Sequence, residues 1–348
     1  MLHSYDPSFI YLQEEDAIKA GAIDMKMTLE AVEDVHKLIA QNQIFNPSKS
    51  HISLPLGSNK DNWESFFNTM PCYIGGDINI AGMKWAAEAK KNAITPGIPQ
   101  GIDVTILSDP ETVLPFCVLN GTLITAMRTG ATAGLFAKYT APSNTETVTS
   151  IGCGVVGRCT IMAVCEAMPQ VKKIYVCDLN MEKAQAIVDE YQPQYPNVKL
   201  VATDDAKAAA MESQVILCQT TSNKEFIDTS WVKPNTSLVA VGNLEVEIDV
   251  VEKCDVIVVD LWEQILISDA RPVAVLHKQG KLQKEDTVDL TDIILDPKKG
   301  RQNDEQFTYS SALGLGALDI MISYKMYLRA KEMGIGQVLK MYDKPEWE

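Results

Sequence analysis

The sequence has no cysteine pair in C-x-x-C spacing and only four histidines, none of them paired as H-x-x-x-H. Its eight cysteines stand mostly in apolar runs such as VILC and IYVC, where a thiol acts as a small buried hydrophobic group. The missing spacings exclude the common zinc sites, and no metal is expected. Cysteines in such runs are typical of a reducing compartment, so a cytoplasmic protein without disulfides is expected.

Long apolar runs and an excess of basic residues are also missing. Because no apolar run has the length of about 18 residues that a membrane span needs, and no basic-plus-apolar segment opens the chain, neither a span nor a secretory leader is expected. The 31 Lys and Arg against 46 Asp and Glu leave a net charge of −15. Nucleic acids and anionic membranes bind basic surfaces, so neither is expected as a partner. The 348 residues suffice for two domains with well-filled cores.

What the sequence does contain is a complete strand-helix-strand unit in residues 147–180, TVTSIGCGVVGRCTIMAVCEAMPQVKKIYVCDLN. A strand at Val148–Ile151 leads into glycines in G-x-G-x-x-G spacing, an apolar helix follows, and a second strand covers Lys173–Val176. Gly152 permits a tight turn, Gly154 leaves room for a pyrophosphate, and Gly157 lets the helix pack close to the strand. The residues expected at the phosphates are Gly152, Cys153, Gly154, Val155, Val156 and Gly157.

Asp178 stands at the end of the second strand, about 20 residues beyond the last of these glycines. A carboxylate in this place accepts hydrogen bonds from an adenosine ribose and repels a 2′-phosphate. No arginine follows it; the next residues are Leu179 and Asn180, which are expected to line the same nucleotide. The cofactor is therefore expected to be NAD(H), with NADP(H) disfavoured. The alternative is a glycine-rich turn that binds no nucleotide.

Strands and helices continue to alternate after this unit, with strands expected at Lys199–Ala202, Val215–Gln219, Ser237–Gly242 and Asp255–Asp260. Such alternation predicts an α/β fold with a Rossmann-type doubly wound parallel sheet. The polar segments QTTSN and VGNLE end two of the strands, and the carboxyl ends of such strands face the ligand. The residues therefore expected near the nicotinamide are Thr220, Thr221, Val241 and Gly242.

The chain before this sheet predicts a second domain of the α+β class, which binds the substrate. Its expected elements are two helices within Phe9–Gln43, a strand at His51–Leu56 in a loop segment from Asn46 to Asn68, and strand pairs at Pro71–Gly75 with Ile78–Ala86 and at Ile102–Ser108 with Thr112–Leu119. The final helix, Ala317–Lys331, is expected to pack back on this domain. Residues 1–125 plus 317–348 then form the substrate-binding domain, and residues 126–316 form the dinucleotide-binding domain.

Arg128 lies in a helix expected at Thr122–Tyr139 that is otherwise uncharged from Gly121 to Phe136. A buried guanidinium needs an anionic partner, because an isolated buried charge costs several kcal/mol. That partner is either a carboxylate of the protein or the carboxylate of a substrate, and the composition alone leaves both open. The neighbouring small residues permit close approach to another helix or to the cofactor, and Thr129 is expected to contact the cofactor.

With these residues in view, the chain resembles the ornithine cyclodeaminase/μ-crystallin family over nearly its whole length. The resemblance is carried by GMKWAAEAK, VLNGTLITAMRTGATAG, SIGCGVVG, VCDLN, AVGN and ALGLGALD, and the N-terminal YLQEEDAIKAGAIDM is similar to one branch of the family. It implies that Lys84 reaches the substrate and exchanges protons with, or polarises, the amine or imine. It also implies that Arg128 binds the substrate carboxylate, and that the protein is a homodimer formed through the first domain.

Two departures from the family pattern concern the substrate. The family has a second carboxylate-binding arginine before an apolar strand, whereas this chain has His51 there, in SKSHISLP. True cyclodeaminases carry a catalytic aspartate shortly after the AVG strand, and the shorter segment AVGNLEVEID offers Asn243 or Glu245 instead. Ornithine cyclisation is therefore the weaker assignment, and His51, Asn243 and Glu245 are candidate catalytic residues.

The combined expectation is an enzyme that moves a hydride between nicotinamide C4 and the α-carbon of an amino or imino acid. Its class is NAD-dependent amino-acid dehydrogenase or imine reductase, with a small amino or imino acid as substrate. One alternative is a cyclodeaminase, in which NAD is reduced and reoxidised within one turnover. The other is a binding protein that keeps the nucleotide but has lost turnover.

Overall fold

The computed structural model describes residues 6–58 and 62–347. These residues group into two compact units. The first unit is formed by Met1–Met27, Gln41–Thr125 and Leu315–Glu348, and the second by Thr28–Ala40 and Ala126–Gly314. The division expected from the sequence puts residues 28–40 in the first domain, whereas in the structure they group with the second unit. Residues 59–61 of the expected N-terminal loop lie outside the described residues.

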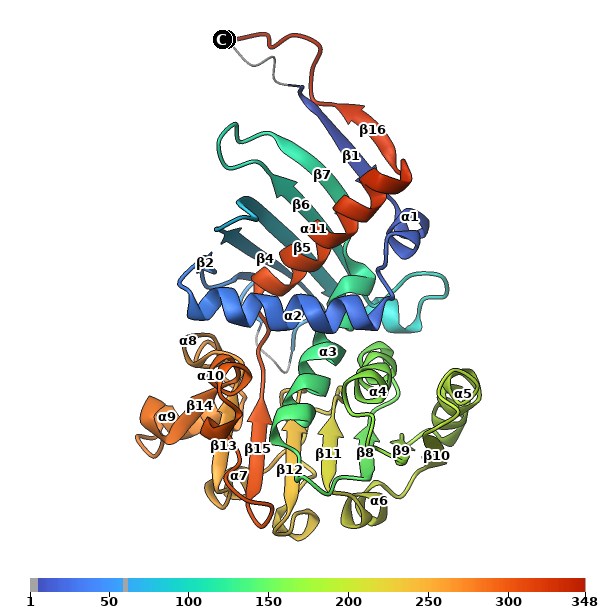
Figure 1. The fold of residues 1–348 in the computed structure, drawn as a ribbon, viewed down its shortest axis with the longest axis vertical. Helices are drawn as coiled ribbons and strands as arrows, with labels where there is room; N and C mark the ends of the chain where they lie inside the picture. The colour runs from blue at the N-terminus through green and yellow to red at the C-terminus, as the bar shows by residue number, and fades with distance from the viewer. Residues whose placement is uncertain (1–5, 59–61, 348) are drawn as a thin grey trace. The chain divides into compact units, whose positions relative to one another are not determined.

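The second unit contains a sheet of eight strands in the order β10-β9-β8-β11-β12-β15-β13-β14, and every pair of neighbours is parallel (Figure 1). The chain enters at β8, moves outward through β9 to β10, and then returns to the other side of β8 at β11. This reversal is the switch point at which doubly wound sheets bind ligands. The expected Rossmann-type doubly wound sheet is confirmed.

The strands of this sheet are β8 (Thr147–Ile151), β9 (Lys173–Cys177), β10 (Lys199–Thr203), β11 (Val215–Cys218), β12 (Thr236–Ala240), β13 (Val256–Val259), β14 (Thr287–Asp289) and β15 (Phe307–Ser311). The helices connected to them are α3 (Thr122–Thr140), α4 (Val155–Ala167), α5 (Met181–Tyr191), α6 (Ala206–Glu212), α7 (Ile248–Glu252), α8 (Trp262–Ile265), α9 (Pro272–Lys278) and α10 (Leu290–Leu295).

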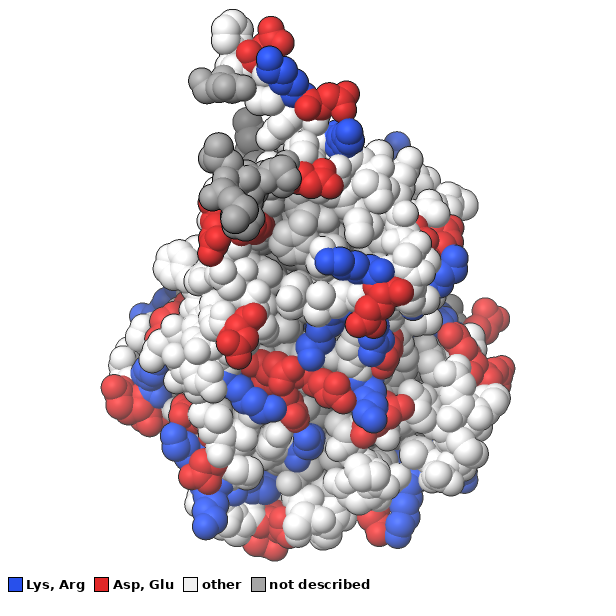
Figure 2. Space-filling model, turned by 45° about the horizontal axis from the view of Figure 1, so that its top comes forward, with Lys and Arg blue, Asp and Glu red and all other residues white. Residues whose placement is uncertain are grey.

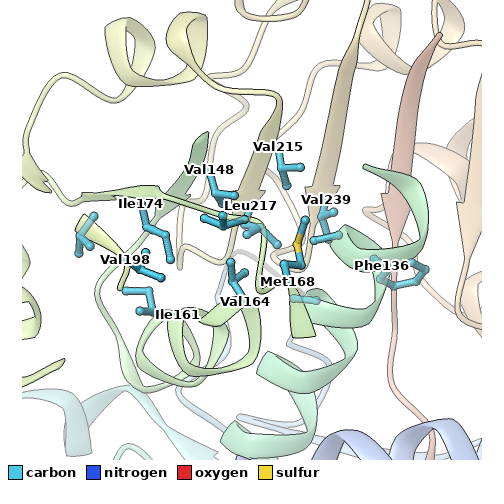
Figure 3. Packing of buried hydrophobic residues seen from close by; sticks show 14 of the residues in the cluster. Phe136, Val148, Ile161, Val164, Met168, Ile174, Val198, Val215, Leu217 and Val239 are labelled. Atoms are coloured by element: carbon cyan, nitrogen blue, oxygen red, sulfur yellow. The ribbon is translucent and has the colours of Figure 1, made fainter. Parts of the chain in front are cut away.

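One of the two hydrophobic clusters of this unit lies between the strands and helices that include α3 and α4 (Figure 3), and the other lies on the opposite face of the sheet. Strand segments such as VILC are buried along their whole length, as parallel strands covered on both faces require. Small residues let the two helices approach: a Cβ on Gly130 would lie 2.5 Å from the backbone of Cys159, and one on Gly134 would lie 2.6 Å from Ala163. Helix packing therefore accounts for these two glycines.

Helix α2 (Met25–Ala40) joins the second unit through polar contacts. Glu33 accepts hydrogen bonds from Lys138 Nζ at 2.7 Å and from Tyr139 Oη at 3.0 Å. The fully buried ring of His36 pairs through Nδ1 with Thr291 Oγ1 at 2.9 Å. Burial lowers the pKa of His36 to about 4, although the charge of Glu33 opposes the shift.

His36 should make the folded state sensitive to acid. A histidine whose pKa is lower in the folded state than in the unfolded one stabilises the protein fully above the unfolded value of about 6.5, and the stabilisation is lost as the pH falls toward 4. Between pH 7 and pH 5 the loss amounts to about 2 kcal/mol. Urea unfolding at both pH values should show this loss of stability in the native protein and not in His36→Gln. The control variant His277→Gln should show the same loss as the native protein. An equal loss in His36→Gln would contradict the assignment.

The first unit contains a second sheet in the order β16-β1-β7-β6-β5-β4-β2, with β3 also paired to β4. Its strands are β1 (Ser8–Leu12), β2 (Ile44–Phe45), β3 (Ser50–Leu54), β4 (Ser65–Ile74), β5 (Ile80–Ala89), β6 (Gly101–Ser108), β7 (Pro115–Asn120) and β16 (Gln337–Lys340). All pairs are antiparallel except β1 with β7. Helix α1 (Glu14–Lys19) follows β1, and α11 (Gly316–Met333) crosses one face of the sheet (Figure 1).

Close packing of α11 on this sheet depends on a glycine. A Cβ on Gly82 of β5 would lie 2.7 Å from Ile320 Cδ1. Alternation along the strands places Met70, Cys72 and Lys84 toward the helix, and all three are buried. An antiparallel sheet covered by a helix is the expected second α+β domain, and that part of the fold class is also confirmed.

Two expected elements of the first unit are wrong. Phe9–Leu12 was expected to be helical, but it forms most of β1, because it pairs with β7 and β16. Ser65–Asn68 was expected to be loop, but it is the beginning of β4, where each residue pairs with β5. In both segments, pairing with strands distant in sequence therefore determines the extended conformation.

Within residues 6–58 and 62–347, no helix is long and apolar enough to cross a membrane. On the face drawn in Figure 2, acidic and basic side chains are interspersed. Ion pairs at the surface include Lys172 with Glu146 and Lys281 with Glu252. Over the same described ranges, no three His, Cys, Asp or Glu side chains gather in a way that could hold a metal ion.

Candidate functional site

The glycine turn between β8 and α4 has the geometry that a dinucleotide needs. Gly152 has φ +105°, a conformation that side chains rarely permit, and a Cβ there would also lie 2.9 Å from Gln219 O. A Cβ on Gly157 would lie 1.9 Å from Gly152 O, so only glycine lets α4 start so close to the strand. A Cβ on Gly154 would have no protein atom within 4 Å. The three glycines thus combine a tight turn, a close helix and an open side.

Two valines follow this open side at the start of α4. Val155 is 68% exposed and Val156 is half-buried, and their backbone N–H groups belong to the first turn, which has no helical acceptors. The N-cap residue is Gly154, so no capping side chain accepts a hydrogen bond from these N–H groups. The donors of this turn therefore fit a pyrophosphate. Cys153 is buried beneath the turn, and burial raises the pKa of its thiol to about 12, so it acts as a packing residue there.

Asp178 lies at the end of β9, beside the same turn. Its Oδ2 accepts a hydrogen bond from Cys153 N at 2.8 Å and its Oδ1 accepts one from Asn180 N at 2.9 Å. Each carboxylate oxygen keeps a further lone pair for a ribose hydroxyl. Asn180 caps α5, and Leu179 is 99% exposed. The carboxylate is thus fixed by the turn that would hold the phosphates, and its contact with the ribose stays a prediction.

Replacing Asp178 by Ala should weaken NADH binding about tenfold and reduce the preference for NADH over NADPH, because the ribose loses a charge-assisted acceptor and a 2′-phosphate is no longer repelled. Fluorescence titration with both nucleotides measures the two effects. Asp205→Ala is the matched control, since Asp205 stands after the next strand and only caps α6. An unchanged preference in Asp178→Ala would contradict the ribose assignment.

The ends of β11 and β12 carry the residues expected near the nicotinamide. Thr220 and Gly242 stand at these ends partly buried, and Thr221 is exposed. Glu245, a candidate catalytic residue, lies beneath them with 1% exposure: it accepts hydrogen bonds from Thr220 N and from Gly242 N, the latter at 2.8 Å. Burial raises the pKa of its carboxyl. In this position Glu245 holds the strand ends through their backbone N–H groups, whereas Asn243 is exposed in the loop that follows β12.

Two further buried charges, which the sequence analysis did not single out, bind the same strand ends. The guanidinium of Arg271 donates to Val241 O at 2.7 Å and to Gly242 O at 2.9 Å. Asp260 Oδ2 accepts from Leu313 N at 2.9 Å and from Gly314 N at 2.7 Å. Burial raises the pKa of Asp260 and lowers that of Arg271. Glu245, Arg271 and Asp260 thus hold the carboxyl ends of β11, β12 and β15 in place.

Arg128 lies in α3, and its guanidinium rests against Gly314, which has φ +89°. A Cβ on Gly314 would lie 2.4 Å from Arg128 Nη1. Because Asp260 binds the N–H of Gly314, the network at the strand ends also fixes the surface on which this guanidinium lies. Thr129, the next residue of α3, is half-buried.

In the first unit, Lys84 of β5 is the centre of a buried polar cluster. Its side chain is 1% exposed, and Nζ donates to Asp319 Oδ1 at 2.9 Å and to Thr125 Oγ1 at 3.3 Å. Thr125 Oγ1 in turn donates to Asp103 Oδ2. Asp319 is fully buried in the first turn of α11, and Asp103 is buried in β6. Of these partners, Asp319 lies in the motif ALGLGALD and Thr125 in the motif VLNGTLITAMRTGATAG, whereas Asp103 lies in neither.

His51, the residue that replaces the second family arginine, is exposed on β3. Both ring nitrogens have protein partners: Nδ1 lies 2.7 Å from Asn68 Oδ1 and Nε2 lies 2.6 Å from Ser53 Oγ. The arrangement satisfies a neutral ring that donates to Asn68 and accepts from Ser53. His51 shares a strand pair with Asn68, and Asn68 pairs with Ala86 in β5, so His51 faces the same side of the sheet as Lys84.

The glycine turn, the carboxylate at the end of β9 and the parallel sheet define a dinucleotide-binding α/β protein. The chain belongs to the ornithine cyclodeaminase/mu-crystallin family, whose model matches residues 24–334. The family expected from the sequence motifs is thereby confirmed.

Three relatives illustrate this membership. The N-((2S)-2-amino-2-carboxyethyl)-L-glutamate dehydrogenase of Staphylococcus aureus is 27% identical over 334 residues, which cover 96% of this chain and 98% of that protein. The alanine dehydrogenase of Archaeoglobus fulgidus is 26% identical over 341 residues, or 96% and 99% of the two chains. The structure of Thermococcus litoralis Delta(1)-pyrroline-2-carboxylate reductase in complex with NADH and L-proline has a TM-score of 0.84 and 27% identity, and the match covers 94% and 99%.

Proposed function

We propose that this protein transfers a hydride between NAD(H) and the α-carbon of an amino or imino acid, as an amino-acid dehydrogenase or imine reductase. The expected class, an NAD(H)-dependent oxidoreductase, is confirmed by relatives that are dehydrogenases and reductases. This chain matches them over nearly their whole length. The observation that carries the substrate assignment is the buried amino group of Lys84, which Asp319 and Thr125 hold on the sheet of the first unit.

The nicotinamide supplies the hydride acceptor or donor when the nucleotide is bound. The residues that would hold it are the backbone of Gly152–Gly157, the Asp178 carboxylate at the ribose, and the ends of β11 and β12 near the nicotinamide half. Glu245 and Arg271 keep those strand ends in place before the nucleotide arrives, so little reorganisation is needed on binding.

Lys84 would trade a proton with the amine or imine nitrogen of the substrate. A protonated amine holds its lone pair in an N–H bond, so it must lose a proton before a hydride leaves its α-carbon. The ammonium of Lys84 is held by Asp319, which fixes its position and its direction. Orientation of a proton donor in this way is a large part of what an enzyme contributes to such a step.

Arg128 would bind the carboxylate of the substrate. Replacement by Ala should raise the KM for a carboxylate substrate about 100-fold, because a charge-assisted pair of hydrogen bonds contributes about 3 kcal/mol. NADH affinity should change little. Lys138→Ala is the matched control, since Lys138 lies on the same helix and pairs with Glu33. If Arg128→Ala instead loses NADH binding and keeps its KM, the arginine serves the cofactor.

The absorbance at 340 nm distinguishes the proposed activity from its rivals. A panel of amino acids with NAD, and of oxo acids or imines with NADH, should give net formation or loss of NADH. A cyclodeaminase would form product and release ammonia without net change. A binding protein would bind NADH and give no turnover with any member of the panel. Either of the last two results would overturn the proposal.

We further propose that the protein is a homodimer formed through the outer face of the first sheet. Opposite the side that carries Lys84, this face exposes Trp85 by 37%, Ile102 by 43% and Val104 by 37%, and Phe67 stacks near Trp85 with ring centroids 5.5 Å apart. A continuous apolar area on a sheet face favours a protein partner. A native monomer in sedimentation analysis, or a dimer that survives Trp85→Lys unchanged, would contradict this.

The cytoplasm is the proposed compartment, because all eight cysteines are free thiols and six of them are buried. Cysteines without disulfides are typical of a reducing compartment. Fractionation that finds the protein outside the cytoplasm would contradict this assignment.

A further inference from the structure

The buried cluster around Lys84 contains two carboxylates, Asp319 and Asp103, whereas an ion pair needs only one. Lys84 on β5, Asp103 on β6, Thr125 in the first turns of α3 and Asp319 in the first turn of α11 all belong to the first unit. Three of them are nearly inaccessible: Lys84 is 1%, Asp103 is 5% and Asp319 is 0% exposed. Burial of two carboxylates with one ammonium is costly, which suggests that the second carboxylate has a task beyond pairing.

The hydrogen bonds that join Lys84, Thr125 and Asp103 all point from the amino group toward the Asp103 carboxylate. An ammonium can only donate, so Lys84 Nζ gives a hydrogen to Thr125 Oγ1 at 3.3 Å. The hydroxyl of Thr125 donates its own hydrogen to Asp103 Oδ2, which lies nearer than its other acceptor, Gly121 O at 3.4 Å. On its other side Lys84 Nζ donates to Asp319 Oδ1 at 2.9 Å. A chain from Lys84 through Thr125 to Asp103 is thereby formed, while Asp319 anchors the amino group.

On the basis of the function proposed above, we propose that Asp319 positions Lys84 and that Thr125 carries a proton between Lys84 and Asp103. In the oxidative direction an N–H bond of Lys84 breaks as an O–H bond forms on Thr125, and the original O–H bond of Thr125 breaks as one forms on Asp103. The amine left on Lys84 then takes a proton from the substrate ammonium, whose N–H bond breaks. The reductive direction reverses each transfer, and no group is oxidised or reduced by them.

The charges of the cluster favour such a relay. Transfer from Lys84 to Asp103 converts an ammonium and a carboxylate into an amine and a carboxylic acid, so the net charge of the buried cluster stays the same. A step that conserves net charge avoids most of the desolvation cost of creating a new buried charge. Uptake of the substrate proton then restores the ammonium opposite Asp319.

Glu88 supports this route because it offers an exit toward solvent. Glu88 and Asp103 lie on neighbouring strands with their side chains on one face of the sheet, as the pairs Ala86 with Asp103 and Glu88 with Gly101 require. Glu88 is only partly buried. Burial and the nearby charge of Asp103 raise the pKa of its carboxyl. It is thus the next acidic group beyond Asp103 and the first that reaches the surface.

Substitution of Thr125 tests the relay. Thr125→Val keeps the shape and removes the hydroxyl, and kcat should fall about 10- to 100-fold with KM little changed. The solvent deuterium isotope effect on kcat should rise, because proton transfer becomes slower than the other steps. Thr125→Ser should restore kcat to within a few fold. A Thr125→Val enzyme with native kcat, or one with reduced kcat and an unchanged isotope effect, would overturn the relay.

The role of Asp319 is tested without turnover. Competitive labelling of the lysines with acetic anhydride, followed by mass spectrometry, gives the pH at which Lys84 is half reactive. Asp319→Asn should lower that pH by about one unit or more. The Asp319 carboxylate stabilises the ammonium form of Lys84, so its loss favours the reactive amine. An unchanged value would overturn the positioning role. If the native enzyme turns over no substrate while Asp319→Asn shows the shift, the proposed function fails and the positioning of Lys84 stands.

Discussion

Lys84→Met should lose turnover by about 10²- to 10⁴-fold, because the proton that the substrate nitrogen exchanges has no other donor held in place. The same substitution should lower the free energy of unfolding by about 3–5 kcal/mol, since it leaves the buried Asp319 carboxylate without its ammonium. Initial rates of NADH consumption and urea unfolding measure the two losses.

The double variant Lys84→Met with Asp319→Asn separates these effects. Because the Asp319 carboxylate is removed together with its ammonium and only Asp103 keeps a buried charge, the double variant should regain part of the lost stability and none of the lost activity. Lys172→Met is the control for removal of an ammonium: its ion pair with Glu146 is exposed and should contribute less than about 1 kcal/mol. A double variant with native kcat would show that Lys84 serves the fold rather than the reaction.

Arg271→Leu should be the most destabilising change in the second unit, by about 3–5 kcal/mol. It removes the donors to the carbonyls at the end of β12 and leaves Glu245 and Asp260 buried without the nearby cation. NADH affinity should fall with it, because we propose that these strand ends line the nucleotide site. Arg158→Leu breaks a partly exposed pair with Glu190 and a contact with Tyr191, and it should cost less than about 1 kcal/mol.

The loss in Arg271→Leu should grow as the pH rises. Without the guanidinium, the pKa values of Glu245 and Asp260 rise further above their unfolded values, and acids raised in this way lose stability as the pH increases toward the folded value. Unfolding measured from pH 5 to pH 8 should therefore show a widening difference from the native protein. Equal stability of the two proteins across this range would contradict the proposed network.

The nucleotide half of the fold could be predicted from sequence because its signals are local. Residues 147–178 contain in order a strand, the glycines, a helix, a second strand and a carboxylate. The structure shows why glycine is needed at two places: Gly152 has a positive φ, and a Cβ on Gly157 would clash with Gly152 O. By contrast, β15 reads FTYSS and gives no apolar signal. It is buried because Arg271 donates to Ser311 and because β12 and β13 pair with it on both sides.

The polar clusters could not be predicted because their members are far apart in sequence. Lys84 meets Asp319 across 235 residues, and Asp319 alone looks like an ordinary acid in the first turn of a helix. Glu245 was chosen from sequence as a candidate catalytic residue; its burial beneath two backbone N–H groups became visible only when β11 and β12 lay side by side. Only the tertiary structure shows which charges are buried together.

Isotope transfer tests the central claim most directly. NADH deuterated at the transferable C4 position, supplied with the imine or oxo acid and amine that the enzyme turns over, should give a product amino acid with one deuterium on its α-carbon, as seen by mass spectrometry. Product that contains no deuterium at that carbon, formed while NADH is consumed, would contradict a direct hydride transfer to the carbon of the C–N bond.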